Sequence, residues 1–201
     1  MIVPVIHCQN WNQIKYNLDI CSKNGIDFVF LINHGHDNPV TTLTEWLLKS
    51  KMEFPNMKFG VNFLQLETSD AITMANQYGA SAIWTDYQGT GDRKCTLFGA
   101  VAFKYQKHVP DYELEFVCKE AMKNMDVITT SGPATGKPAS IEKIEKIRSY
   151  IGDFPLAIAS GVNKENKKLF EPLVDYMLVA SSITDNNEMI IESKLIELLN
   201  A

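Results

Sequence analysis

Most of the polar side chains that could do chemistry in this chain come directly after a short apolar run. His7 follows IVPVI, Asn62 ends KFGVN, and Asp86 follows SAIWT. Parallel strands in α/β proteins bring the residues at their carboxyl ends to one edge of the sheet, where catalytic and binding groups gather. The candidate positions are His7, His34, His36, Asn62, Asp86, Lys104, Lys107, His108, Ser131, Ser160 and Ser181.

Asp86, His7 and Lys107 are the candidates for catalysis. A carboxyl or imidazole group near the middle of the sheet edge could move a proton, and Lys107 could neutralise developing negative charge. Asn62 would then orient the substrate. Lys104 or Lys107 could also act as an acid, a Schiff-base amine or an anion clamp, and the alternative is a solvated lysine at a strand end.

Small residues end two apolar runs near the carboxyl terminus. Ser160, Gly161 and Val162 follow one run, and Ser181 and Ser182 follow the next. Backbone N–H groups bind phosphate where no bulky side chain blocks its approach. These residues therefore predict a phosphate subsite, although serine and glycine also end strands without any such role.

His34 and His36 flank a glycine, which places two imidazole groups on the same side of an extended segment. This arrangement suits a divalent metal, and Asp86 or His7 could supply a third ligand. The alternative is a loop with two exposed histidines. We assign no metal ligand from the sequence and leave any cofactor unknown.

Two motifs of nucleotide-binding proteins and hydrolases are missing. The stretch GPATGKP at 132–138 has three residues between its glycines and proline after the lysine, whereas a phosphate-binding P-loop needs four residues and Ser or Thr. The sequence G-x-S-x-G of a nucleophile elbow does not occur. The four cysteines show no C-x-x-C spacing, so we expect reduced thiols.

Apolar runs alternate with helical periods along the whole chain. Such alternation predicts either a closed (β/α)8 TIM barrel or an open doubly wound sheet, and eight strands favour the barrel as one domain over 1–201. The polar stretch 87–96 has no helical period, so we expect no helix after strand 4. The expected strands are 2–7, 27–32, 58–64, 81–85, one within 97–106, 126–132, 156–161 and 176–181. Helices are expected from 10 or 12 to 25, over 41–51, 69–78, 111–125 and 140–152, from 163, and over 188–199.

Two faces can be assigned from side-chain type. In the helix 41–51, four apolar residues are expected to face inward: Leu43, Trp46, Leu47 and Leu48. The densest basic group, Lys164, Lys167 and Lys168, is expected to be a solvated helix face.

Composition limits the partners of this protein. The chain has 201 residues, 19 Lys and Arg against 24 Asp and Glu, and a net charge of -5, which argues against a nucleic-acid surface. The first residues lack the basic region and cleavage site of a signal peptide, and no apolar run is long enough to cross a bilayer. We therefore expect a cytoplasmic protein without membrane insertion, and a homo-oligomer remains open.

Three segments carry a resemblance to a known family. They are SGPATGKP at 131–138, ASGVNKEN at 159–166 and VASS at 179–182, with looser matches at PVIH (4–7), GVN (60–62) and KH (107–108). The chain resembles the BtpA/SgcQ group of TIM barrels, within the ribulose-phosphate-binding barrels. The family's strand 5 commonly reads Asp-x-His-x-Lys-His, whereas this chain has FKYQKH at 103–108.

The resemblance implies a TIM barrel that binds a phosphorylated small molecule, a sugar phosphate or a nucleotide-like compound, at the mouth of the barrel. It adds Thr135 and Gly136 to the expected binding residues, because both lie in the first matching segment. A lyase, isomerase or transferase on such a substrate is one function that fits. The other is a non-catalytic accessory or assembly protein that keeps the barrel as a scaffold.

Overall fold

A computed structural model describes residues 1–35, 37–89 and 91–201, and in it eight parallel strands form a closed barrel. The strands are β1 (Ile2–His7), β2 (Phe28–Ile32), β3 (Lys58–Asn62), β4 (Ala82–Thr85), β5 (Thr96–Ala100), β6 (Val127–Thr130), β7 (Leu156–Ala159) and β8 (Tyr176–Val179). The helices are α1 (Trp11–Lys23), α2 (Pro39–Glu53), α3 (Thr68–Tyr78), α4 (Asp111–Asn124), α5 (Ile141–Ile151), α6 (Lys167–Phe170) and α7 (Glu192–Asn200).

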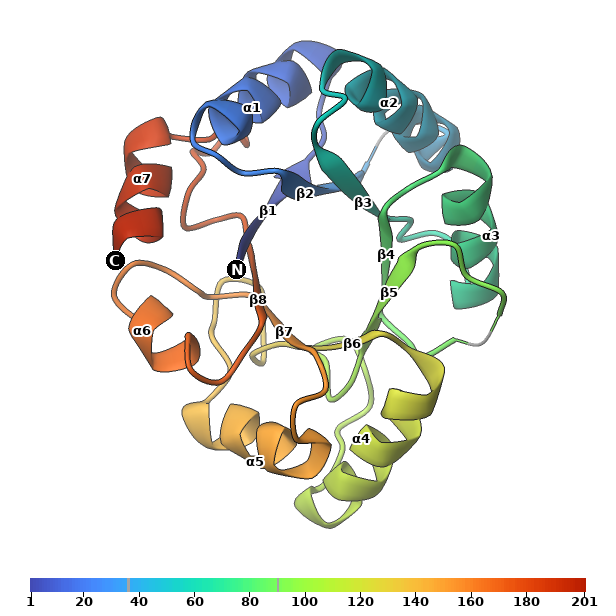
Figure 1. The fold of residues 1–201 in the computed structure, drawn as a ribbon, viewed down its shortest axis with the longest axis vertical. Helices are drawn as coiled ribbons and strands as arrows, with labels where there is room; N and C mark the ends of the chain where they lie inside the picture. The colour runs from blue at the N-terminus through green and yellow to red at the C-terminus, as the bar shows by residue number, and fades with distance from the viewer. Residues whose placement is uncertain (36, 90) are drawn as a thin grey trace.

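The strands pair in sequence order, and β8 closes the ring by pairing with β1 through Val3 and Leu178. The helices surround the strands, as Figure 1 shows. In the described residues between β4 and β5 a loop replaces the helix. The predicted (β/α)8 TIM barrel and its missing helix after strand 4 are both confirmed.

Helix ends follow from capping residues. The side chain of Asn10 accepts a hydrogen bond from the backbone N–H of Gln13 and caps α1, which decides between the two starts, 10 and 12, that the sequence left open. Ser140 does the same for α5 through the N–H of Lys143. Each cap satisfies a backbone donor that the first helical turn leaves unpaired, so these two side chains fix where the helices begin.

Two apolar cores stabilise the barrel. The larger core lies between the strands and the surrounding helices, and the smaller one fills the barrel interior. Aromatic rings dominate the interior: the ring centroid of Phe30 lies 5.2 Å from that of Phe98 and 5.9 Å from that of Trp84, both in edge-on contacts. Because these rings fill the barrel, a ligand has room only at an end of it.

Strand 5 lies at Thr96–Ala100, at the start of the range 97–106 in which it was expected; residues 101–106 form turns and bends, so the segment that carries Lys104 is a loop. Two predicted helix starts were wrong. The final helix begins at Glu192 rather than at 188, and α6 has only four residues. Leu48 is 42% exposed and faces away from the core.

The basic group near α6 was also wrongly interpreted. Lys167 is 8% exposed, and its ammonium group donates hydrogen bonds to the backbone oxygens of Leu199 and Ala201. A cation is favourable at these positions because the last carbonyls of a helix have no partner within the helix. Lys167 therefore fastens α7 to the barrel.

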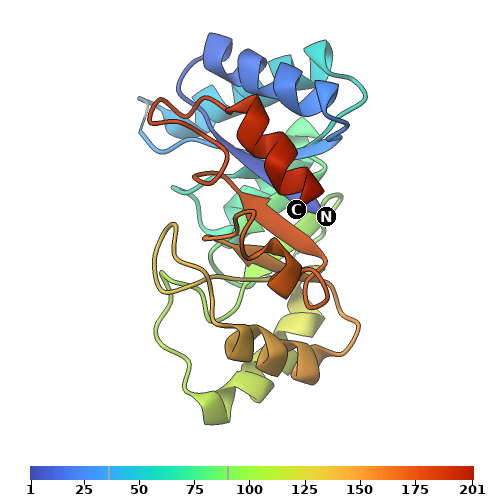
Figure 2. The same ribbon diagram turned by 90° about the vertical axis from the view of Figure 1, so that its left-hand side faces the viewer.

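Figure 2 turns the barrel on its side and shows both chain termini at one end of it. The loop between β8 and α7 lies at the opposite end, where the strands have their carboxyl ends. Among the described helices, none has the length and hydropathy that crossing a membrane requires.

Candidate functional site

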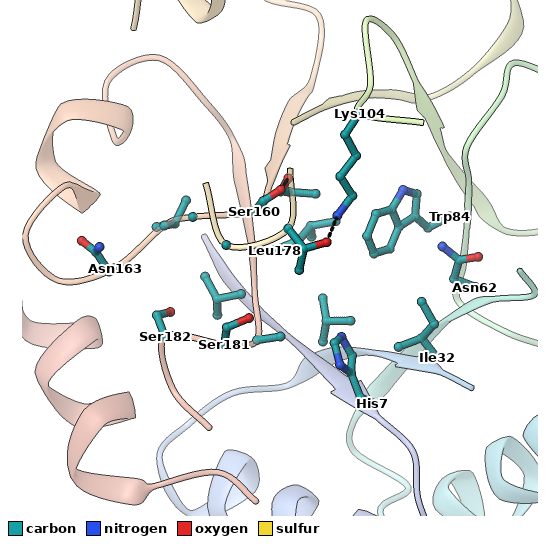
Figure 3. Close-up of a pocket in the computed structure, with 18 of the residues that line it drawn as sticks. His7, Ile32, Asn62, Trp84, Lys104, Ser160, Asn163, Leu178, Ser181 and Ser182 are labelled. Carbon is teal, nitrogen blue, oxygen red and sulfur yellow. Dashed lines mark hydrogen bonds between the residues drawn. The ribbon is translucent and has the colours of Figure 1, made fainter. Parts of the chain in front are cut away.

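A cavity of about 520 Å³ opens at the carboxyl ends of the strands. This volume lies within the range of sites for small molecules. Figure 3 shows Trp84 and Asn62 at one side of the cavity, Ser182 and Asn163 at the opposite side, and Lys104 across from His7. The cavity therefore has two ends that are built from different elements.

The first end combines apolar walls with a few polar groups. Trp84 is 8% exposed and Asn62 is 4% exposed, and both line the cavity where β4 and β3 end. Asp86 follows β4 by one residue and also lines it. Burial raises the pKa of the Asp86 carboxyl group, and the positive charge of Lys104 opposes this shift. A carboxyl group with a raised pKa is suited to donate or accept a proton.

Lys104 is held over the cavity by a chain of hydrogen bonds. Its backbone N–H donates to the hydroxyl of Ser131 (2.9 Å), and its ammonium group donates to the hydroxyl of Thr135 (3.0 Å), the bond drawn in Figure 3. The ammonium group also lies 4.9 Å from the centre of the Tyr105 ring. The ring face and the hydroxyl orient the cation, so Lys104 presents its charge to a ligand from a fixed position.

His7 forms the opposite wall together with His34. The two rings are in an edge-on contact with centroids 4.8 Å apart, and both line the cavity. Nδ1 of His7 lies 3.2 Å from Oε1 of Glu188, in the loop after β8. Burial lowers the pKa of His34, as does the nearby His7, so His34 favours its neutral form.

The second end consists of the loops after β7 and β8. Within the described residues, the backbone N–H groups of Gly161, Val162, Ser181 and Ser182 donate to no protein acceptor. The hydroxyl oxygen of Ser182 is buried and also has no partner there. Buried polar groups in proteins are nearly always paired, so the Ser182 hydroxyl marks a place where a ligand or water completes the site, and the four N–H groups are further donors that a ligand could use.

Close packing of two glycines fixes the shape of this end. A Cβ atom on Gly161 would lie 2.1 Å from the backbone nitrogen of Pro138, and one on Gly132 would lie 2.0 Å from the backbone oxygen of Lys137. Residues 137–138 of the loop after β6 therefore pack closely against both glycines. The same loop carries Thr135 and Gly136 to the cavity. This contact gives a physical reason for the glycines in the segments SGPATGKP and ASGVNKEN.

Lysines and acids share the rim. Lys164 forms an ion pair with Glu197, whereas Lys194 on the same rim has no ion-pair partner within the described residues. Lys194 therefore adds to the lining of the cavity a positive charge that no ion pair of the described residues neutralises.

Most of the residues predicted from the sequence meet at this cavity. Those that line it are His7, His34, Asn62, Asp86, Lys104, Thr135, Gly136, Ser160, Gly161, Val162, Ser181 and Ser182. Lys107 and His108 are exposed and do not line it, because the turns after β5 point Lys104 inward instead. Ser131 is fully buried below the cavity and supports Lys104.

Three further residues of the site were missed in the sequence. They are Trp84, Glu188 and Lys194. A signal existed for Glu188, because α1 carries Gln13 and Asn17 among its inward apolar residues, and buried amides need polar partners.

The metal hypothesis gains no support. Across 1–35, 37–89 and 91–201, no group of three or more His, Cys, Asp or Glu side chains could hold a metal ion. His36 lies outside the described residues, so the pair that it would form with His34 stays a prediction.

Comparisons with known proteins identify the fold. No protein-family model matches the chain, and no curated protein does. Phosphoribosyl anthranilate isomerase from Thermus thermophilus is similar in structure, with a TM-score of 0.69 at 10% identity over 100% of this chain and 97% of that one. Thiamine phosphate pyrophosphorylase from Pyrococcus furiosus gives 0.65 at 13% identity, over 99% and 93% of the two chains. A structure described as native KDPGal gives 0.68 at 9% identity, over 99% and 92%. At such identities the likeness concerns the fold alone, and the chain shares the TIM-barrel fold with these proteins.

Proposed function

We propose that this chain is a BtpA/SgcQ-like barrel protein that binds a phosphorylated small molecule at the carboxyl-terminal face of its barrel and acts on it as an enzyme. The observation that carries the proposal is the set of unpaired backbone N–H groups in the loops after β7 and β8, beside the buried hydroxyl of Ser182. A phosphate group has three acceptor oxygens, which can pair with several converging donors at once.

The charge of the rim supports the same ligand. Lys194 has no acidic partner in the described part of the chain, so a phosphate in this cavity would meet a cation that no ion pair neutralises. Two of the similar barrels, phosphoribosyl anthranilate isomerase and thiamine phosphate pyrophosphorylase, carry phosphorylated compounds in their names. The ligand's phosphate would therefore bind at the Ser182 end of the cavity.

The rest of the ligand would lie toward the other end, where the candidate catalytic groups are. Asp86 and His7 could transfer protons, and Asn62 could orient the ligand. Lys104 takes over the electrostatic role that the sequence suggested for Lys107, because Lys104 lines the cavity and Lys107 does not. A proton-transfer reaction on a phosphorylated substrate, such as an isomerisation or a lyase step, fits these groups best.

A scaffold without catalysis is the second candidate. In the segment FKYQKH, Tyr105 occupies the place of an imidazole in the resembling family, and its side chain is 61% exposed. Loss of that group would remove a proton carrier while leaving the phosphate end unchanged. Binding of a phosphorylated compound that is not converted over hours, followed by NMR of the ligand, would favour this candidate.

The direct test is thermal unfolding with inorganic phosphate, ribose 5-phosphate and ribose. A ligand at 100 times its dissociation constant adds about 2.7 kcal/mol to the free energy of unfolding. For a chain of this length that corresponds to a rise in Tm of about 5–10 °C. We expect ribose 5-phosphate to raise the Tm and ribose to leave it unchanged.

Two variants locate the phosphate. Ser182→Ala removes a buried hydroxyl without a partner, so the ligand-free protein should be at least as stable as the wild type while the rise with ribose 5-phosphate shrinks. Lys194→Met should also reduce that rise, and Lys168→Met, a change of an exposed lysine away from the cavity, is its matched control. An undiminished rise in both Ser182→Ala and Lys194→Met would refute the proposed phosphate subsite.

A further inference from the structure

The loop after β8 contains a tight turn that carries one residue in an unusual conformation. Thr184 and Ile190 form an isolated antiparallel bridge, and the carboxylate of Asp185 accepts the backbone N–H groups of Asn187 (2.8 Å) and Met189 (2.9 Å). Glu188 lies within this turn with φ of 59°, in the left-handed region. Residues with a Cβ atom adopt this region rarely, so the surrounding structure must impose it.

Two amides on α1 impose it. The side-chain amides of Gln13 and Asn17 donate hydrogen bonds to the same acceptor, the backbone oxygen of Glu188, at 2.7 and 2.8 Å. The other end of the Asn17 amide accepts the N–H of Ile190 at 2.7 Å. Gln13 is 5% exposed and Asn17 is 1% exposed, so both amides are buried to hold this turn. Buried amides are costly unless they are paired, and here their pairing fixes Glu188.

The turn brings the Glu188 carboxylate behind His7. Oε1 of Glu188 lies 3.2 Å from Nδ1 of His7, whereas Glu188 itself does not line the cavity. His7 does line it, and Figure 3 shows its ring at the cavity wall. Nε2 of His7 has no hydrogen-bond partner within the described residues. Oε1 of Glu188 lies within ion-pair distance of Nδ1, and a negative carboxylate beside that nitrogen favours a proton on it, because a carboxylate oxygen can only accept.

We propose that Glu188 is a positioning residue, which holds His7 in the tautomer with the proton on Nδ1 and so leaves Nε2 as the proton acceptor of the cavity. An acceptor beside one imidazole nitrogen favours the tautomer that carries its proton on that nitrogen. Nε2 would take a proton from a C–H or O–H group of the ligand, the electron pair of that bond would stay on the ligand, and the imidazolium would lie against the carboxylate. The same proton would later return from Nε2 to the product.

This inference rests on the proposed function, because it assumes that the cavity is the ligand site. If the proposal holds, the strained backbone at Glu188 serves to place its carboxylate beside His7. Glycine adopts the left-handed region without strain, and a glycine at 188 keeps the backbone oxygen that Gln13 and Asn17 bind. Glu188→Gly should therefore be at least as stable as the wild type, whereas a purely structural role for the Glu188 side chain predicts a lower Tm.

The test combines thermal unfolding with side-chain ¹⁵N NMR of the ligand-free protein at alkaline pH, with the His7 signals assigned by their loss in His7→Gln. We expect the wild type to carry the proton on Nδ1, Glu188→Gln to retain that tautomer through its amide oxygen, and Glu188→Gly to lose it. Asn38→Gly is the matched control, because Asn38 also has a left-handed φ of 51° but no contact with His7, so its His7 signals should not change.

Two results would overturn the inference: unchanged His7 signals in Glu188→Gly, or a Tm of Glu188→Gly clearly below that of the wild type. Neither measurement uses a ligand. A failure here therefore leaves the phosphate test above intact, and a failure of the phosphate test leaves the tautomer of His7 to be read independently.

Discussion

Replacing three glycines by alanine, one at a time, separates the two forces that shape the end of the cavity beside Ser182. Gly136 has φ of 75° and open space around its Cα, so Gly136→Ala imposes backbone strain alone. Gly132 has no positive φ, but its Cβ would lie 2.0 Å from the backbone oxygen of Lys137, so Gly132→Ala imposes a clash alone. Gly161 has φ of 71° and a Cβ position 2.1 Å from the nitrogen of Pro138, so Gly161→Ala imposes both.

The expected losses in the free energy of unfolding follow from these contacts. Left-handed backbone costs alanine about 1–2 kcal/mol, which sets the effect of Gly136→Ala. Forcing an extra methyl group into a packed region costs about 1–3 kcal/mol, which sets that of Gly132→Ala. Gly161→Ala should lose about 2–5 kcal/mol, the sum of these two ranges. Alanine also restricts the unfolded chain, but that gain of about 0.4–1 kcal/mol applies to all three variants and does not change their order.

Urea unfolding of the three variants measures these losses, provided that the slope of free energy against urea concentration stays constant. The loss in the double variant at Gly132 and Gly161 should differ from the sum of the losses in its single variants, because both clashes act on the same segment, 137–138. If Gly161→Ala lost no more than Gly136→Ala, close packing of the loop would not be what shapes this end of the cavity.

Three further variants test individual side chains. Burial raises the pKa of Asp86, so at a pH above the ordinary pKa of a carboxyl group its negative charge destabilises the folded state. Asp86→Asn should therefore raise the free energy of unfolding at neutral pH, and a gain of the same size at acidic pH would contradict this cause. Burial lowers the pKa of Lys143 from 10.5 to about 8, so the unfolded chain binds the proton of this amine more tightly than the folded protein does. The free energy of unfolding should therefore rise by about 1–2 kcal/mol between pH 8 and 10.5 relative to that of Lys143→Met, and parallel pH profiles of the two proteins would exclude this effect. Lys167→Met removes the charged donor at the end of α7 and should cost about 1–3 kcal/mol in urea unfolding, whereas Lys168→Met should cost almost nothing.

Much of the fold is determined by short stretches of sequence. The strands β2 and β7 are continuous apolar runs, and β4 is apolar up to its last residue, Thr85; all three are buried along their whole length. Helix starts at Asn10 and Ser140 were predictable because an N-cap depends on side chains within three residues. The missing helix after β4 was predictable because helix formation needs an apolar period that 87–96 lacks.

The position of the residues at the Ser182 end of the cavity was also predictable, since these residues come directly after strand ends. Ser160, Gly161, Ser181 and Ser182 come within three residues of the last residue of β7 or β8, so the fold alone brings them to the mouth of the barrel. Where a strand ended early the prediction failed. β5 stops at Ala100, and the turns that follow decide that Lys104, and not Lys107, reaches the cavity.

Only the tertiary structure decided the partners of His7 and the role of Lys167. Asn17 and Glu188 are 171 residues apart in the chain, and the ring of eight strands brings them together when β8 pairs with β1. From the sequence, Lys167 is expected to be one of three solvated lysines. In the structure its ammonium group donates a hydrogen bond to a backbone oxygen at the end of α7. The local sequence determines which donors and acceptors a segment carries and where its apolar residues recur. Closure of the barrel determines which of these groups, far apart in the chain, come into contact, and the His7–Glu188 pair depends on that closure.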